Sequence, residues 1–244
     1  MLECKNLTKV YSKKCVVDHI SFQVHPGEVF ALLGSNGAGK TTTIKMILGL
    51  VRQSSGEIKL HEGIKIGYSP DMPYFQPFLT GQETLDYYAA VGKMPKRQCR
   101  RETARLLEIV GLHEDRTKVR NYSKGMLQRL AIAQSLLGDP NLLILDEPTA
   151  GLDAVGRIEI LNLIERLKKT GKTIILNSHI LSDVERICDR GIIMQNGIVV
   201  TEFDKRTFAA KNLQEIFMEA VGTQQSPENG GKAGNSSYDY NNSI

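Results

Sequence analysis

The stretch Gly34-Ser35-Asn36-Gly37-Ala38-Gly39-Lys40-Thr41 combines glycines, a lysine and a hydroxyl in the pattern G-x-x-x-x-G-K-[ST]. The glycines allow the backbone to curl so that successive N–H groups point inward, and the N-terminus of a following helix adds positive potential. Lys40 can then reach the β and γ phosphates of a nucleotide, and the Thr41 hydroxyl can ligate magnesium. A glycine-rich turn with a chance lysine is the alternative, but an apolar strand pattern precedes the loop and a helical pattern follows it. The stretch therefore predicts a nucleoside triphosphate site.

Two carboxylates, Asp146 and Glu147, end the apolar run in "LLILDEP". In a parallel sheet this end of a strand lies next to the phosphate loop. Asp146 is then placed to hold magnesium, and Glu147 to accept a proton from the attacking water or to orient it. The alternative is a pair of carboxylates at an ordinary strand terminus.

A histidine, His179, follows another buried-strand pattern, "TIILNS". A histidine at that place can donate a hydrogen bond to a γ-phosphate or position a water. A lone histidine is usually structural, so position alone leaves both interpretations open.

Alternating strand and helix patterns surround these residues. "HISFQV" and "VFALLG" read as strands on either side of a turn at residues 25–28, and "SNGAGKTTTIKMILGL" follows as loop and helix. From about residue 71 to 121 the pattern is mostly helical, with Thr80 and Glu83 as a capping box and a second helix between Pro95 and Gly111.

The alternation then resumes with helix "MLQRLAIAQSLLG", strand "NLLILDE", helix "GRIEILNLIERLKKTG", strand "TIILN" and helix "LSDVERICDR". Asn196-Gly197, between two alternating runs, predicts a hairpin. Strands that alternate with helices predict an α/β fold with a largely parallel sheet covered on both faces.

Composition places limits on the class of protein. The 244 residues are 41% hydrophobic and 24% charged, with a net charge of +4 from 31 basic and 27 acidic residues. This excess of basic residues is too small to indicate nucleic-acid binding. The apolar runs fall short of the roughly 20 residues that cross a bilayer, and the N-terminus has no secretion-signal pattern, so we expect a cytoplasmic protein. The cysteines are isolated, which favours reduced thiols over a metal site: Cys4, Cys15, Cys99 and Cys188.

Taken together, these motifs and their order resemble the nucleotide-binding subunit of an ATP-binding-cassette (ABC) transporter. The resemblance covers residues 1–221 and implies an ABC-ATPase fold: a phosphate-loop core, an N-terminal antiparallel β-subdomain and a helical insert at about 71–121. Residues 222–244 have almost no aliphatic side chains, and we expect a disordered polar tail there.

The resemblance also implies roles for individual residues. Tyr11 would stack on adenine, and Asp153 would belong to the loop after the acidic strand. ATP and Mg²⁺ are the implied cofactors, with Lys40, Glu147 and His179 catalytic. Phosphate contacts are implied for Gly34, Ser35, Asn36, Gly37, Ala38, Gly39, Lys40, Thr41 and Thr42, and metal contacts for Thr41, Asp71 and Asp146.

The turn Tyr122-Ser123-Lys124-Gly125-Met126 corresponds to the family's signature, usually Leu-Ser-Gly-Gly-Gln. In this family two cassettes pack head to tail, so Ser123 and Gly125 would grip the γ-phosphate of ATP held by the partner. An ordinary N-cap serine is the alternative interpretation. Lys124 and Met126 depart from the pattern, and the lysine adds charge near the phosphate. Asp71 stands where the family usually has glutamine, and its shorter reach demands a water between carboxylate and magnesium.

The preferred function is an ATP-hydrolysing subunit that powers a membrane transporter through ATP-driven dimerisation of two cassettes. "SKGM", "AGLD" and "SHILSDVE" resemble cassettes of bacterial exporters with a separately encoded permease, which places the chain on the cytoplasmic face of the membrane. We expect the permease to dock near Tyr74, Phe75 and Phe78, although Phe78 with Leu79 could instead staple the following helix. The alternative function is a soluble ABC-type ATPase acting on nucleic acid or the ribosome. A kinase or GTPase is least favoured, because no N-K-x-D motif is present.

Overall fold

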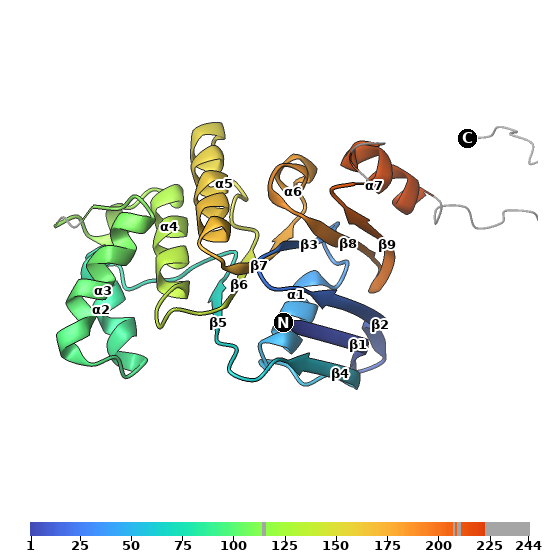
Figure 1. Cartoon of the computed structure of the whole chain (residues 1–244), viewed down its shortest axis with the longest axis horizontal. Coiled ribbons are helices and arrows are strands. Elements are labelled where there is room, and N and C mark those ends of the chain that lie inside the picture. The colour runs from blue at the N-terminus through green and yellow to red at the C-terminus, as the bar shows by residue number, and fades with distance from the viewer. Residues whose placement is uncertain (114–115, 207, 209–210, 223–244) are drawn as a thin grey trace, which may run out of the picture.

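The computed structural model describes residues 1–113, 116–206, 208 and 211–222. Within these residues the chain forms two β-sheets with helices packed around them (Figure 1). The strands are β1 (Leu2–Tyr11), β2 (Lys14–Val24), β3 (Val29–Gly34), β4 (Ser55–Leu60), β5 (Ile66–Ser69), β6 (Leu142–Asp146), β7 (Thr173–Ser178), β8 (Arg190–Gln195) and β9 (Ile198–Asp204). The helices are α1 (Lys40–Ile47), α2 (Gly81–Val91), α3 (Lys96–Ile109), the 3-10 turn η1 (Val119–Asn121), α4 (Lys124–Ser135), α5 (Ala154–Lys169), α6 (Leu181–Ile187) and α7 (Leu213–Gly222).

The larger sheet has the strand order β5-β6-β7-β3-β8-β9. All neighbours in it are parallel except β9, which pairs antiparallel with β8. The smaller sheet, β2-β1-β4, is antiparallel. This arrangement confirms the predicted α/β fold with a mostly parallel sheet and an N-terminal antiparallel part.

Strand β3 shows why the larger sheet is covered on both faces. Its side chains alternate, as the pleat requires: Ala31 and Leu33 face a core with α4, α5, α6 and α7, while Phe30 and Leu32 face α1 and the small sheet. All six residues of β3 are buried. The phosphate loop that follows therefore starts from a rigid, central strand.

The two strand patterns around residues 25–28 do form strands, but β2 belongs to the small sheet and β3 to the large one. The turn between them thus joins the two sheets rather than closing a hairpin.

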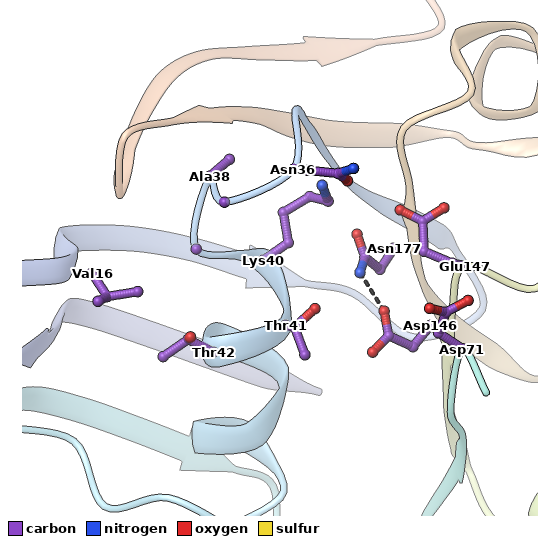
Figure 2. Close-up of a pocket in the computed structure, with 12 residues that line it drawn as sticks. Val16, Asn36, Ala38, Lys40, Thr41, Thr42, Asp71, Asp146, Glu147 and Asn177 are labelled. Atoms are coloured by element: carbon purple, nitrogen blue, oxygen red, sulfur yellow. Dashed lines mark hydrogen bonds between the residues drawn. The ribbon is translucent and has the colours of Figure 1, made fainter. Parts of the chain in front are cut away.

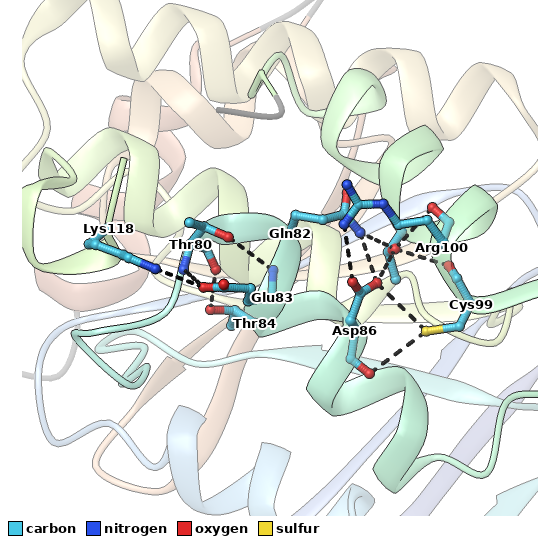
Figure 3. Close-up of polar contacts among 9 residues, drawn as sticks. Thr80, Gln82, Glu83, Thr84, Asp86, Cys99, Arg100 and Lys118 are labelled. Carbon is cyan, nitrogen blue, oxygen red and sulfur yellow. Dashed lines mark hydrogen bonds and ion pairs between the residues drawn. The ribbon is translucent and has the colours of Figure 1, made fainter. Parts of the chain in front are cut away.

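The helical segment after β5 is held by local hydrogen bonds. Thr80 and Glu83 form the predicted capping box at the start of α2. The carboxylate of Asp86 in α2 accepts from Gln82 of the same helix at 2.8 Å and from Thr103 of α3 at 2.5 Å, and Arg100 of α3 lies at 3.5 Å (Figure 3). These contacts join α2 to α3.

The start of α2 also contacts the chain that leads into α4. Lys118 forms an ion pair with Glu83 at 3.1 Å, and Val119 donates its N–H to the carbonyl of Leu79. A Cβ at Gly81 would lie 2.5 Å from the Tyr122 hydroxyl, so the tyrosine packs directly on that glycine.

The hairpin between β8 and β9 confirms the turn predicted at Asn196-Gly197, with φ angles of 49° and 87°. Gly197 donates its N–H to the carbonyl of Ala38 in the phosphate loop, and its own carbonyl accepts from Asp18 of β2. A Cβ at Gly197 would lie 2.6 Å from the Val16 carbonyl oxygen. The hairpin turn therefore contacts both the small sheet and the phosphate loop.

Helix α7 was not anticipated from the sequence. It packs against the core through Leu213, Ile216, Phe217 and Ala220. The expected polar tail, apart from Gly222, lies outside the described residues. All four cysteines are free, as expected, with Cys4 and Cys188 buried. Among the described residues, no helix is both long and apolar enough to cross a membrane.

Candidate nucleotide site

The phosphate loop opens on a cavity of about 280 Å³. Residues from three strand ends line it together with the loop: Val16, Asn36, Gly37, Ala38, Gly39, Lys40, Thr41, Thr42, Asp71, Asp146, Glu147 and Asn177. In Figure 2, Lys40 and Thr41 lie on one side of the cavity and Asp146 and Glu147 on the other. The parallel sheet thus brings together the loop and the acidic strand end, as predicted from the sequence.

Lys40, the first residue of α1, is buried inside the loop. Its Nζ donates to the carbonyls of Gly34 at 2.5 Å and Ser35 at 3.1 Å. Burial lowers the pKa of Lys40, and the carboxylates of Glu147 and Asp146 oppose that shift. The ammonium is therefore held by carbonyl oxygens until a stronger anion, such as a phosphate, replaces them.

The loop has the backbone that this position requires. Gly37 and Gly39 have φ angles of 83° and 101°, a region that residues with a Cβ rarely adopt. A Cβ at Gly39 would also lie 2.8 Å from the Val16 carbonyl oxygen. Because Gly39 precedes α1 and offers no side-chain cap, the first N–H groups of that helix remain available to an anion.

Asp146 ends β6 and is only 3% exposed. Asn177, its partner in the parallel register of β7, donates to Oδ1, and the Tyr68 hydroxyl donates to Oδ2 at 3.3 Å. Burial raises the pKa of Asp146, Asp71 raises it further, and the hydrogen bonds from Asn177 and Tyr68 oppose the shift. A carboxylate in this condition is stabilised by any cation that enters the cavity.

Glu147 and His179 form a pair beside the cavity. Glu147 Oε2 lies 2.8 Å from His179 Nδ1, and the side chains are 12% and 47% exposed. Glu147 has a left-handed φ of 49°, and its N–H donates to the Asn177 carbonyl at 2.9 Å. Such a backbone costs about 1–2 kcal/mol and turns the carboxylate out of the strand direction toward the histidine. An ionised Glu147 requires the histidine to donate from Nδ1.

The side chains that could hold magnesium supply only oxygen. Thr41, Asp71 and Asp146 all line the cavity, which suits a hard cation. Among the described residues no group of three or more His, Cys, Asp or Glu side chains could hold a metal by itself. Magnesium usually takes one or two carboxylates and completes its shell with phosphates and water, so these residues fit it as a companion of the nucleotide.

A second cavity, of about 310 Å³, lies between the turn before α4 and the loop before α5. It is lined by Ser123, Lys124, Gly125, Arg129, Gly151, Leu152, Asp153, Val155, Gly156 and Glu159. Ser123 caps α4 by accepting from the Met126 N–H at 3.2 Å, and Asp153 caps α5 by accepting from Gly156 at 2.8 Å. The ends of two helices thus converge on one depression, away from the phosphate loop.

Residues 17–150, more than half of the chain, match the family model for the ABC transporter. The chain belongs to the ABC transporter family. The ATP-binding protein YxlF of Bacillus subtilis is 43% identical over 91% of this chain and 77% of its own length. The bacitracin transport ATP-binding protein BcrA of Bacillus licheniformis is 41% identical over 83% of this chain and 69% of its own. The chain spans 57% and 53% of the length of two other curated relatives.

Among solved structures, the ABC cassette MJ0796 superposes with a TM-score of 0.75 and 26% identity. The match covers 84% of this chain and 99% of that one, which was solved as a dimer in a post-hydrolysis state with ADP and Pi. The family identifies the chain as a transport ATPase that binds and hydrolyses ATP, and the dimer with ADP and Pi is a property of the neighbour MJ0796.

Other predicted residues of the cassette lie outside the phosphate-loop cavity. Tyr11 ends β1, is 44% exposed and lies under the Lys9 ammonium, 4.8 Å from its ring centre. It does not line the cavity, whereas Val16 of the neighbouring strand does. Adenine stacking by Tyr11 therefore stays a prediction.

The prediction of an exposed aromatic patch at Tyr74, Phe75 and Phe78 was wrong for Phe75. Phe75 is 6% exposed and packs edge to face on Tyr88, with ring centres 6.2 Å apart. Tyr74 and Phe78 are 78% and 62% exposed, and Met72 is 83% exposed. Phe75 is thus a core residue of the helical segment, and Met72 takes its place on the surface.

Two residues that contact Asp146, namely Asn177 and Tyr68, were not identified from the sequence. Asn177 ends a buried strand as Asp146 does, and a polar residue at that position was a usable signal. Tyr68 depends on β5 pairing with β6, which no local pattern shows.

Proposed function

We propose that this cassette drives a separately encoded permease from the cytoplasmic face of the membrane. Two copies pack head to tail, so that ATP on the phosphate loop of one copy also contacts Ser123 and Gly125 of the other. Mg²⁺ accompanies the nucleotide at Thr41, Asp146 and Asp71. Export is the favoured direction, from the resemblance of the motifs to exporter-type cassettes.

The division of the chemistry between two cavities supports this proposal. One cavity holds the phosphate loop and the acidic strand end, and the other holds the signature turn. The part of the second cavity that the structure describes has no phosphate loop in its lining, which supports a signature turn that contacts ATP held by a second molecule.

The glycine at position 125 is the observation that best supports head-to-tail pairing. A Cβ added there would meet only Leu152 Cδ2 and Ser123 Oγ, both at 4.0 Å, which is ordinary contact distance. Neither a positive φ nor the packing of the free chain requires a glycine at this helical position. Since glycine costs roughly 0.5–1 kcal/mol in a helix relative to alanine, its presence fits a surface that an outside group approaches closely.

In the proposed reaction, water attacks the γ-phosphorus, the bond to the β-phosphate oxygen breaks, and ADP and phosphate leave. Glu147 takes the proton of the attacking water. His179 holds Glu147 in place through its Nδ1–H, and its other ring nitrogen donates toward the γ-phosphate oxygens when the imidazole is protonated. Lys40 moves its ammonium from the Gly34 and Ser35 carbonyls to the β and γ phosphates. Bound magnesium neutralises charge on the phosphate oxygens.

The permease contact is proposed at Met72, Tyr74 and Phe78. These large side chains are among the most exposed apolar groups of the described residues, and they follow Asp71 of the nucleotide cavity within a few residues. A partner that covers these side chains would contact the segment that directly follows Asp71, the proposed magnesium contact. Nucleotide state and permease contact are thus linked through one short loop.

The test is recovery of the partner. Tagged Glu147→Gln cassette is purified with Mg-ATP from detergent-solubilised membranes of the native host, and bound proteins are identified by mass spectrometry. We expect a polytopic membrane protein in stoichiometric amount. The double variant Tyr74→Ala/Phe78→Ala should lose it, while Leu50→Ala, which alters another exposed apolar residue, should keep it. Recovery of ribosomes or DNA-bound proteins instead would support the soluble ATPase.

A further inference from the structure

Lys124 extends over the neighbouring loop in the second cavity. A Cβ placed on Gly151 would lie 2.3 Å from Lys124 Nζ and 3.5 Å from its Cε. Gly151 itself has a φ of 67°, a backbone conformation that residues with a Cβ rarely adopt. The lysine stem therefore spans from the first turn of α4 to the loop that precedes α5, and its ammonium lies on the bare backbone of Gly151.

The charge on Lys124 is not balanced within the described part of the chain, where no hydrogen bond or ion pair to it is formed. The acids of the same cavity are engaged elsewhere. Asp153 caps α5 by accepting from Gly156 at 2.8 Å, and Glu159 faces Arg129 at 3.6 Å. The Lys124 ammonium, in contrast, is left without an acceptor.

The position is also unfavourable for a cation by itself. Lys124 is the first residue of α4, and its ammonium reaches the loop before α5, so it lies near the positive ends of two helices. A cation at a helix N-terminus is destabilised, and an anion is stabilised, by the helix dipole. The same surface would be favourable once an anion is placed between the ammonium and the helix ends.

We propose that Lys124 is a ligand of the γ-phosphate of ATP held by a second copy of this chain. This assignment rests on the proposed head-to-tail pairing and deepens it. Ser123 and Gly125 supply a hydroxyl and backbone N–H groups, which recognise the shape of a phosphate. Lys124 supplies a full positive charge, which attracts the terminal phosphate that ADP lacks. Because Gly151 offers only backbone, the ammonium can leave it for the phosphate without unpacking a side chain.

The test compares variants in the Glu147→Gln background, where ATP is bound and not consumed. Lys124→Met keeps an apolar stem over Gly151 and removes the charge, and Lys124→Arg keeps the charge. Lys169→Met, in the last turn of α5, is the matched control for loss of an exposed lysine. Light scattering gives the Mg-ATP concentration at half-maximal dimerisation, and titration at low protein concentration gives ATP affinity of the monomer.

We expect Lys124→Met to raise the half-maximal Mg-ATP concentration about ten- to a hundredfold, the range for loss of one charge-assisted hydrogen bond. Monomer affinity for ATP should stay unchanged, because that ATP sits on the phosphate loop. Lys124→Arg should restore dimerisation to within about threefold, and Lys169→Met should match the reference. Added salt should weaken dimerisation of the reference more than that of Lys124→Met.

Equal dimerisation of Lys124→Met and the reference would overturn the assignment of Lys124 and leave the pairing intact. Failure of Lys124→Arg to restore dimerisation would also overturn it, since the charge would then not be the acting feature. A reference protein that stays monomeric at saturating Mg-ATP would overturn the pairing of identical copies, and the assignment of Lys124 with it.

Discussion

Gly125→Ala should stabilise the free cassette and weaken its dimer, two effects of opposite sign from one methyl group. In the free chain the new Cβ meets its nearest neighbours at 4.0 Å, so no steric cost arises. Alanine gains roughly 0.5–1 kcal/mol over glycine in a helix. For a domain of this size that gain raises the melting temperature by about 1–4 °C.

In the head-to-tail dimer the same methyl group would stand between the helix N–H groups and the γ-phosphate. Loss of one hydrogen bond to a charged group costs about 1.5–3 kcal/mol. A dimer of identical copies has the defect at both sites, so the total is about 3–6 kcal/mol. The dissociation constant of the dimer should therefore rise roughly 10²- to 10⁴-fold.

Two measurements separate these effects. Thermal unfolding without nucleotide reports on the free chain, and light scattering with Mg-ATP in the Glu147→Gln background reports on the dimer. Gly92→Ala is the control, because Gly92 caps the end of α2 with a negative φ and does not line the second cavity. Dimerisation of Gly125→Ala at the reference Mg-ATP concentration would refute the reasoning. A lowered melting temperature would show that the free chain itself needs the glycine.

Three further predictions concern the cavity and the helical segment. Glu147→Gln should bind ATP with unchanged affinity and hydrolyse it at least roughly a hundredfold more slowly in single-turnover assays. Glu62→Gln, at an exposed site, is the control and should hydrolyse ATP at the wild-type rate. A wild-type rate for Glu147→Gln would show that Glu147 is not the base. Because the folded-state pKa of Asp146 is raised, its favourable contribution is present at acidic pH and lost as the pH rises through that pKa. Asp146→Asn should therefore stabilise the free protein at neutral pH, by about 0.5–1 kcal/mol, with the gain vanishing on acidification in a pH series of unfolding curves; a gain that persists at acidic pH would contradict this. Thr80→Ala, which removes the capping box of α2, should lower the free energy of unfolding by about 1 kcal/mol in urea unfolding, and no change would show that Lys118 and Glu83 hold the helix start alone.

The sequence was sufficient where local patterns carry the structure. The phosphate loop, the acidic strand end, the capping box at Thr80 and the turn at Asn196-Gly197 all depend on residues close together in the chain. Parallel pairing then follows from the alternation of strands and helices, and this places Asp146 near Lys40.

What depends on distant contacts was not predictable in the same way. Phe75 was expected on the surface and is buried against Tyr88, because packing of the helical segment decides its exposure. The role of Tyr68 depends on the register of β5 against β6. Helix α7 is a different case, because Leu213, Ile216, Phe217 and Ala220 follow a helical spacing that could have been recognised. The domain limits at residues 1–221 and the insert at 71–121 stay predictions.

The place of β3 in the sheet has a consequence for synthesis of the protein. Its two neighbours are β7 and β8, so Phe30 can pair on both sides only after Ile175 and Arg190 have been synthesised. At roughly 5–20 residues per second, a nascent chain needs about 10–30 s to supply them. Throughout that time an apolar strand and its nucleotide loop are without their native supports. The growing polypeptide therefore cannot form its ATP pocket until four fifths of it has been translated, and chaperones have their longest opportunity at its first forty residues.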